Sequence, residues 1–143
     1  MVSVLDRFED GRLNVVVQGR ERFRLLELTD GRSFQTGDVA EVVDDDDPAD
    51  TDTVVRALAL FERLRAATGS DVEVPSAETE QLSFVLAGRV ELAPEVKLEL
   101  LAELSEQARL SRVCELLELA SQAVERQRRA AERAAGNGRV DLG

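Results

Sequence analysis

Residues 38–52 read DVAEVVDDDDPADTD, and they contain eight acidic residues and no basic one. They hold eight of the eleven excess negative charges in a chain of 143 residues. An acidic run that includes a proline, here Pro48, is typical of a solvated hinge between two parts of a fold. We therefore expect a first lobe in residues 1–48 and a second lobe in residues 49–137.

The residues before the acidic run are typical of β-strands. Apolar and β-branched residues gather in four runs, at 2–8, 13–18, 22–28 and 39–43. Asp10-Gly11 favours a tight type I′ turn, in which both central residues need positive φ. Asp30-Gly31 predicts a later turn, and Gly19 predicts a bulge or a short turn between the second and third strands. Together these signals predict an antiparallel meander.

The residues after the acidic run have helical periodicity. Gly69 is expected to end the first helix, and Ser76 is expected to cap the second. The expected helices begin near residues 51, 76, 94 and 106, and the last contains about thirty residues. The predicted fold class is α+β, a small antiparallel β lobe followed by an α-helical bundle that ends in a long helix. Residues 138–143 are expected to form a disordered tail.

The composition excludes most enzymatic chemistry. The chain contains no His, Tyr or Trp, and one cysteine, Cys114. Without His there is no usual general base near neutral pH, no Ser-His or Cys-His pair and no imidazole ligand for a metal ion. One cysteine can form neither an internal disulfide nor a cysteine-based zinc site. We expect no enzyme activity, no catalytic residue, no cofactor and no metal ion.

The remaining candidates for chemistry have simpler structural interpretations. The run 44–47 lacks the spacing, central Gly and terminal Glu of a calcium loop. Lys97, the only lysine, is not followed by the Ser or Thr of a phosphate-binding loop. Cys114 is expected to pack as a small hydrophobic residue. A hydrolase with paired carboxylates would need one carboxyl in an apolar pocket, and the acids lie mainly in the hinge and on helix faces.

Charge and hydropathy limit the partners and the location. The net charge is −11 and the five aromatic residues are all Phe, which disfavours a nucleic-acid partner. The chain has no apolar stretch long enough to span a membrane, and its start lacks the positive flank of a signal peptide. We expect a cytoplasmic protein with no membrane partner.

Two segments carry a family resemblance. The first is residues 10–25, DGRLNVVVQGRERFRL, a hairpin with a Gly followed shortly by Arg and an apolar residue. The second runs from residue 82 to residue 117, where the matching positions are Leu82, Val85, Leu86, Val90, Leu92, Pro94, Lys97, Leu100, Leu101, Leu104, Arg109, Leu110 and Leu117. In this order and spacing the segments resemble the N-terminal, substrate-recognition domain of the ATP-dependent Lon proteases. The only lysine falls on the lysine position of that family.

The resemblance implies a β-rich lobe followed by a helical bundle, in agreement with the patterns above. In the full-length proteases this domain engages unfolded or tagged substrates, and its last helix leads to the ATPase. Here the sequence ends at residue 143, without an ATPase or a protease module, and it starts almost at the hairpin, without the usual first strands. The expected function is therefore a stand-alone, non-catalytic protein-binding module, related to proteolysis, that engages unfolded or exposed apolar segments.

A β lobe of this size is too small to make its own core, so we expect it to pack on the helices, on a second copy of the chain or on a missing segment. The candidate partner-binding residues are Val2, Val4, Phe8 and Phe34. The first three lie on an open strand edge, and Phe34 follows a Gly turn, where a side chain is accessible to solvent. The alternative function is a structural or assembly protein that forms a homodimer through the open β edge.

Overall fold

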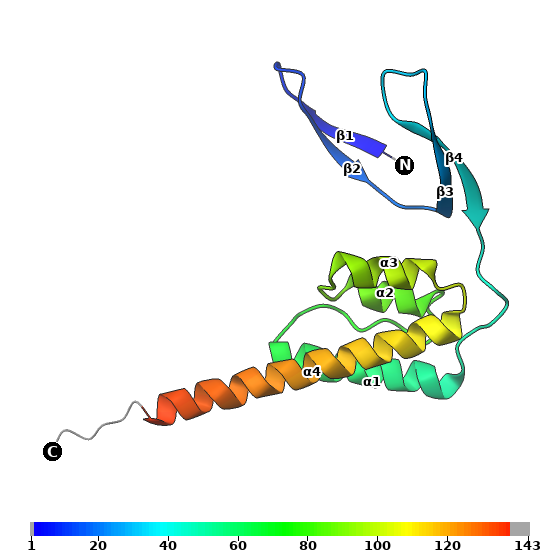
Figure 1. The fold of residues 1–143 in the computed structure, drawn as a ribbon. Helices are drawn as coiled ribbons and strands as arrows, with labels where there is room; N and C mark the ends of the chain where they lie inside the picture. Colours follow the sequence, from blue (N-terminus) through cyan, green and yellow to red (C-terminus); the bar gives the residue numbers. More distant parts are fainter. Residues whose placement is uncertain (1, 138–143) are drawn as a thin grey trace. The chain divides into compact units, whose positions relative to one another are not determined.

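The computed structural model describes residues 2–137, four strands followed by four helices (Figure 1). The chain divides into two compact units, residues 1–43 and residues 44–143. The first contains the strands and the second contains the helices, which confirms the predicted α+β class. The predicted tail, residues 138–143, lies outside the described residues.

The β unit consists of two separate hairpins. Strand β1 (Val2–Arg7) pairs antiparallel with β2 (Leu13–Val17), and β3 (Arg22–Thr29) pairs antiparallel with β4 (Thr36–Val42). Each pair forms its own two-stranded sheet, so the predicted meander is wrong. Residues 18–21 join β2 to β3 without a tight turn, and these two strands therefore do not pair.

Asp10 and Gly11 lie in the loop of the first hairpin, but the turn that they form is of a different type from the one predicted. The Phe8 N–H donates to the Arg12 carbonyl at 3.0 Å, and the Gly11 N–H donates to the Phe8 carbonyl at 3.1 Å. Of the two predicted turn residues only Gly11 has positive φ, +86°. A type I′ turn needs positive φ at both positions, so the prediction of this turn type is wrong. The loop has three residues, with a left-handed Gly before the second strand.

The helical unit contains α1 (Thr51–Thr68), α2 (Leu82–Gly88), α3 (Pro94–Ala102) and α4 (Glu106–Asn137). Helices α1 and α2 both pack against α4 (Figure 1). The buried apolar residues form one cluster, Ala57, Leu60, Phe61, Leu82, Leu86, Leu100, Leu110, Val113, Cys114 and Leu117. The apolar faces predicted from the periodicity therefore meet in one core.

Local signals fix most of the helix ends. The Asp50 carboxylate accepts the Thr53 N–H at 2.6 Å and caps α1, and Gly69 ends this helix with φ +68°. The prediction that Ser76 caps the second helix is wrong, because α2 begins at Leu82. The Ser76 hydroxyl instead accepts the Glu78 N–H, in a local turn that competes with helix formation.

The segment 44–50, called here the acidic strap, is anchored to the start of α4. The Asp45 N–H donates to the Leu104 carbonyl at 3.1 Å, and the Gln107 N–H donates to the Asp47 carbonyl at 3.2 Å. The Ser105 hydroxyl donates to the Asp47 carboxylate at 2.5 Å. The strap is exposed to solvent at residues 45–48 and lies directly after the boundary between the two units, but these hydrogen bonds hold it to the start of α4. The strap belongs to the helical unit, and the two units divide between residues 43 and 44.

Arg109 fixes the first residue of the strap. Its side chain is fully buried, and its Nη1 and Nη2 atoms donate to the two carboxylate oxygens of Asp44 at 3.2 and 3.0 Å. Nη2 also donates to Glu106 at 2.7 Å, and the guanidinium lies over the Phe84 ring at 4.0 Å. Burial acts to lower the pKa of Arg109, but hydrogen bonds to Asp44 and Glu106 outweigh it and raise this pKa. Arg109 therefore stays charged in the interior.

The same guanidinium joins α2 to α4. Arg109 Nε donates to the Ser83 hydroxyl at 2.7 Å, and Nη1 donates to the Glu103 carbonyl at 2.6 Å. Ser83 in turn donates to Glu106 from its hydroxyl at 2.6 Å and from its backbone N–H at 2.9 Å. With these contacts all five N–H groups of the guanidinium have an acceptor.

The substitution Arg109→Ala is expected to lower the free energy of unfolding by about 3–5 kcal/mol, because it leaves the partly buried carboxylates of Asp44 and Glu106 and the buried Ser83 hydroxyl without their partner. Urea unfolding followed by circular dichroism measures this loss. The matched control is Arg112→Ala, which breaks ion pairs with Glu99 and Glu115 at the surface of the same helix. The control should cost about 1 kcal/mol or less. Equal losses in the two variants would contradict the role assigned to Arg109.

The second hairpin depends on a glycine. A Cβ atom at Gly37 would lie 2.6 Å from Leu25 Cδ1 and 2.7 Å from the Glu27 carbonyl oxygen, on the opposite strand. Gly37→Ala is therefore expected to disrupt the β3–β4 pairing. The control Gly19→Ala meets no atom within 4 Å. Amide hydrogen exchange of β4 should become faster in the first variant and stay unchanged in the second. Unchanged exchange in both would refute this packing constraint.

Candidate functional site

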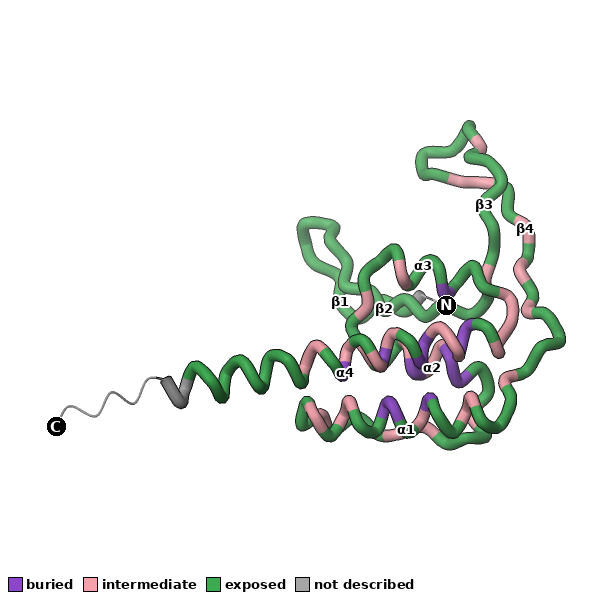
Figure 2. Tube along the Cα trace, turned by 60° about the horizontal axis from the view of Figure 1, so that its bottom comes forward, coloured by how far each residue is buried: buried purple, intermediate pink, exposed green. Residues whose placement is uncertain are grey.

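Each of the four strands of the β unit has exposed apolar side chains. None of the residues 3–43 is buried, whereas the buried residues lie in the helical unit (Figure 2). The exposed large apolar residues of the β unit are Val4, Leu5, Phe8, Leu13, Val15, Val16, Val17, Phe23, Leu25, Leu26, Leu28, Phe34, Val39 and Val43. Large apolar surfaces of this kind mark protein interaction sites in soluble proteins. The candidate site is therefore the surface of this unit.

The residues predicted to bind partners lie on both hairpins. Val4 is in β1 and is 51% exposed, and Phe8 follows β1 and is 42% exposed. Phe34 lies in the loop between β3 and β4 and is 61% exposed. The backbone of Val2 pairs with that of Val17 in the first hairpin, and the side chain of Val2 lies outside the described residues. The structure thus places Val4 and Phe8 on one hairpin and Phe34 on the other.

Arginine side chains accompany both loop phenylalanines. The Arg12 guanidinium lies over the Phe8 ring at 5.4 Å, and the Arg32 guanidinium lies over the Phe34 ring at 5.8 Å. Contacts of a cation with an aromatic face contribute roughly 0.5–1 kcal/mol at exposed sites. They orient the rings without burying them. Each loop therefore presents an aromatic ring beside a positive charge, on a chain whose net charge is −11.

The sequence analysis missed the exposed apolar residues of β2 and β3. A strand at the surface usually buries one of its two faces, which would place Phe23 of β3 in a core. Phe23 is instead 64% exposed. The consecutive residues Leu25 and Leu26 contain the signal, since neighbouring side chains of a strand point to opposite faces. A strand with apolar residues on both faces needs partners on both sides.

The structure offers little for catalysis or metal binding. Within residues 2–137 no group of His, Cys, Asp and Glu side chains could hold a metal ion. Cys114 is fully buried, and burial raises the pKa of its thiol, which confirms its expected packing role. Lys97 is exposed on α3. No helix in the described part of the chain is both long and apolar enough to cross a membrane.

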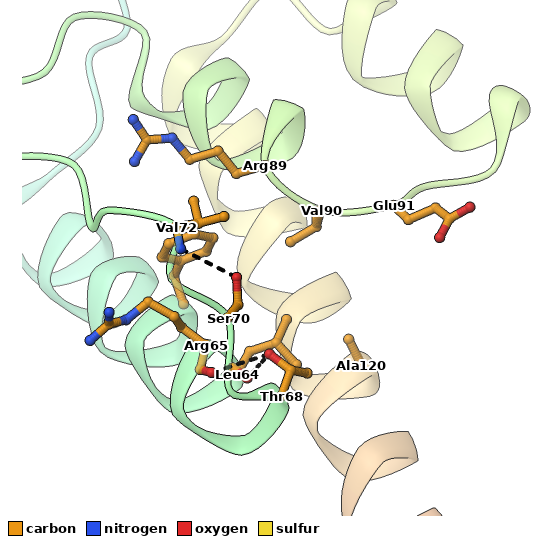
Figure 3. A pocket seen from close by; sticks show the side chains of 10 residues that line it. Leu64, Arg65, Thr68, Ser70, Val72, Arg89, Val90, Glu91 and Ala120 are labelled. Atoms are coloured by element: carbon orange, nitrogen blue, oxygen red, sulfur yellow. Dashed lines mark hydrogen bonds between the residues drawn. The ribbon is translucent and has the colours of Figure 1, made fainter.

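One pocket of about 220 Å³ lies in the helical unit (Figure 3). Its wall comes from the end of α1, the segment 70–72, the residues after α2, and Ala120 of α4. Two of its hydroxyl groups are used within the protein: the Thr68 hydroxyl donates to the Leu64 carbonyl, and the Ser70 hydroxyl accepts the Val72 N–H. The volume is below the 300–1,000 Å³ that is typical of cofactor sites.

A comparison with models of protein families shows to which family the chain belongs. The model of the ATP-dependent protease La (LON) substrate-binding domain matches residues 2–118. The chain belongs to the Lon substrate-binding domain family. Both segments that carry the resemblance, residues 10–25 and 82–117, lie inside the matched range.

A curated relative supports the same assignment. The chain is 30% identical over 129 residues to Lon protease 1 of Hydrogenovibrio crunogenus (strain DSM 25203 / XCL-2). The alignment covers 82% of this chain and 16% of that protease. The chain therefore spans a small part of the length of this relative. The Lon substrate-binding match includes both hairpins, helices α1 to α3 and the beginning of α4.

Proposed function

We propose that this protein is a non-catalytic recognition module that binds unfolded proteins and exposed apolar segments of other polypeptides in the cytoplasm. The observation that carries the proposal is the exposed apolar surface of the β unit, which lies within the matched substrate-binding domain. The partners are proteins, and the proposal includes no nucleic acid, no membrane and no cofactor.

The proposed contact has a sufficient driving force. Complete burial of one Val, Leu or Phe side chain contributes about 1.5–3 kcal/mol. A dissociation constant of about 1 μM corresponds to about 8 kcal/mol, after the cost of association. Because association itself costs about 4 kcal/mol or more, about four to eight of the exposed side chains, with Phe8 and Phe34 among them, are needed for binding in the micromolar range. Weak and reversible binding of this kind suits the recognition of many different sequences.

The test compares the binding of reduced, carboxymethylated α-lactalbumin, an unfolded model protein, by wild-type protein and by the double variant Phe8→Ser/Phe34→Ser. We expect the double variant to bind at least about tenfold more weakly, because two apolar anchors are lost. The control is Leu98→Ser, which removes an even more exposed apolar residue, 68% exposed, from α3. The control should bind like wild type. No binding by wild type up to about millimolar concentration would refute the proposed function.

The assembly role through the β1 edge is the second candidate. The open edge of β1 favours it, since a two-stranded hairpin leaves unpaired backbone groups for another chain. Sedimentation over a broad concentration range separates the two functions. A dimer that persists at micromolar concentration supports the assembly role, whereas a monomer that binds unfolded protein removes it.

A further inference from the structure

The four strands of the β unit differ in how well their edges are protected. Each strand pairs on one side only, so each of the two sheets has two open edges. Proteins protect open edges with charged residues, bulges, prolines or short strands. Strand β1 carries Asp6 and Arg7 and is irregular between Val4 and Asp6, where Leu5 has no direct partner. The β1 edge therefore has two of these protective features.

The second sheet is protected in the same way. Strand β3 is irregular between Leu25 and Glu27, and it also carries Arg22 and Arg24. Strand β4 carries Asp38 and Glu41. Charged side chains on both strands would be desolvated by an added apolar strand, which is unfavourable. Neither edge of this sheet is a good acceptor for such a strand.

Strand β2 has none of these features except shortness. Its sequence is Leu-Asn-Val-Val-Val, residues 13–17, with no charge, no proline and no glycine. Its five residues pair with β1 without an irregularity on the β2 side. All five are exposed. A regular, uncharged strand rich in β-branched residues is the form of edge that attracts another strand.

The register of the β1–β2 pair shows which β2 residues direct their backbone N–H and C=O groups toward the open edge. The Arg12 carbonyl faces β1, because it accepts the Phe8 N–H. In an antiparallel pair, successive residues alternate between facing the partner and facing away. Asn14 and Val16 therefore face β1, and Leu13, Val15 and Val17 direct their N–H and C=O groups away from it.

We propose that an extended, uncharged apolar segment of another polypeptide binds by adding as a strand to the open edge of β2. This inference rests on the proposed function and specifies its site and its geometry. Backbone hydrogen bonds give affinity without demanding a sequence, and the apolar side chains of β2 select β-branched or aromatic neighbours. The charged edges of the other strands confine the addition to β2.

The size of the edge favours a transient segment over a second copy of the chain. Five residues at about 3.4 Å each give an edge of about 17 Å. Two copies joined along this edge would bury far less than the roughly 1,200 Å² of a stable interface. A flexible segment can follow the edge and then contact neighbouring apolar residues. Binding in the range of about 1–100 μM is the expected outcome.

The experiment uses a matched pair of proline variants, one on each strand of the first hairpin. Val15 of β2 and Arg7 of β1 both direct their N–H groups outward, toward opposite edges, because Phe8 and Arg12 face each other and successive residues alternate. Proline at either site removes one outward N–H and is tolerated at an edge. The probe is a fluorescein-labelled peptide with four Thr-Val repeats between terminal lysines, and its binding is measured by fluorescence anisotropy.

We expect Val15→Pro to weaken peptide binding about tenfold or more, through the lost hydrogen bond and the steric block, and Arg7→Pro to change it less than about threefold. Unchanged binding by Val15→Pro, or an equal loss in both variants, would overturn the inference. A wild-type dimer that Val15→Pro dissociates would also overturn it, since a second copy would then occupy the edge.

A second measurement avoids any change in the protein. Peptides that are N-methylated on alternate residues keep their side chains but lose hydrogen bonds along one edge. When the residues of both alternating sets are N-methylated, the peptide has no N–H group on either edge. Wild-type protein should bind this peptide at least about tenfold more weakly than the unmodified peptide. Equal affinity would show that backbone pairing is absent. If wild type binds neither the peptide nor carboxymethylated α-lactalbumin, the proposed function itself fails; binding without sensitivity to Val15→Pro rejects only strand addition.

Discussion

The buried guanidinium of Arg109 is the constraint on which the helical unit depends. Removal of a charged group from water costs several kcal/mol, and the interior tolerates it only when every donor has an acceptor. Here all five N–H groups are used, and their acceptors come from the strap, from α2 and from the junction of α3 and α4. These elements are therefore stable only together, since loss of any one leaves a polar group of this cluster without a partner.

The two units differ in the source of their stability. The helical unit has an apolar core and the Arg109 cluster, and its order extends through the strap to Asp44. The β unit has no buried residue between positions 3 and 43, and a two-stranded sheet is only marginally stable in water. Its side chains are consequently held at the surface instead of in a core. The same lack of a core that makes the β unit weak makes its apolar surface available for binding.

Helix ends that depend on neighbouring residues could be predicted from the sequence. Contacts between residues far apart in the sequence could not. The cap at Asp50, the left-handed Gly69 and the first-turn Pro94 act within a few residues, so they can be identified from sequence. The pair of Arg109 and Asp44 joins positions 65 residues apart, which is why the acidic run resembled a free hinge. Exposure of Phe34 was predictable from its loop, whereas Phe8 was expected at an open strand edge and the exposure of Phe23 depends on which strands pair.

The open, apolar edge of β2 is a hazard as well as the proposed binding site, because backbone groups that are open to a foreign segment are also open to a second copy. The distribution of charge over the β unit resolves this conflict in part. Irregularities in β1 and β3 and charged residues on β1, β3 and β4 protect three edges, and the net charge of −11 makes copies repel each other. A neutral segment experiences no such repulsion. The combination favours a foreign, uncharged strand over self-association at the proposed β2 site.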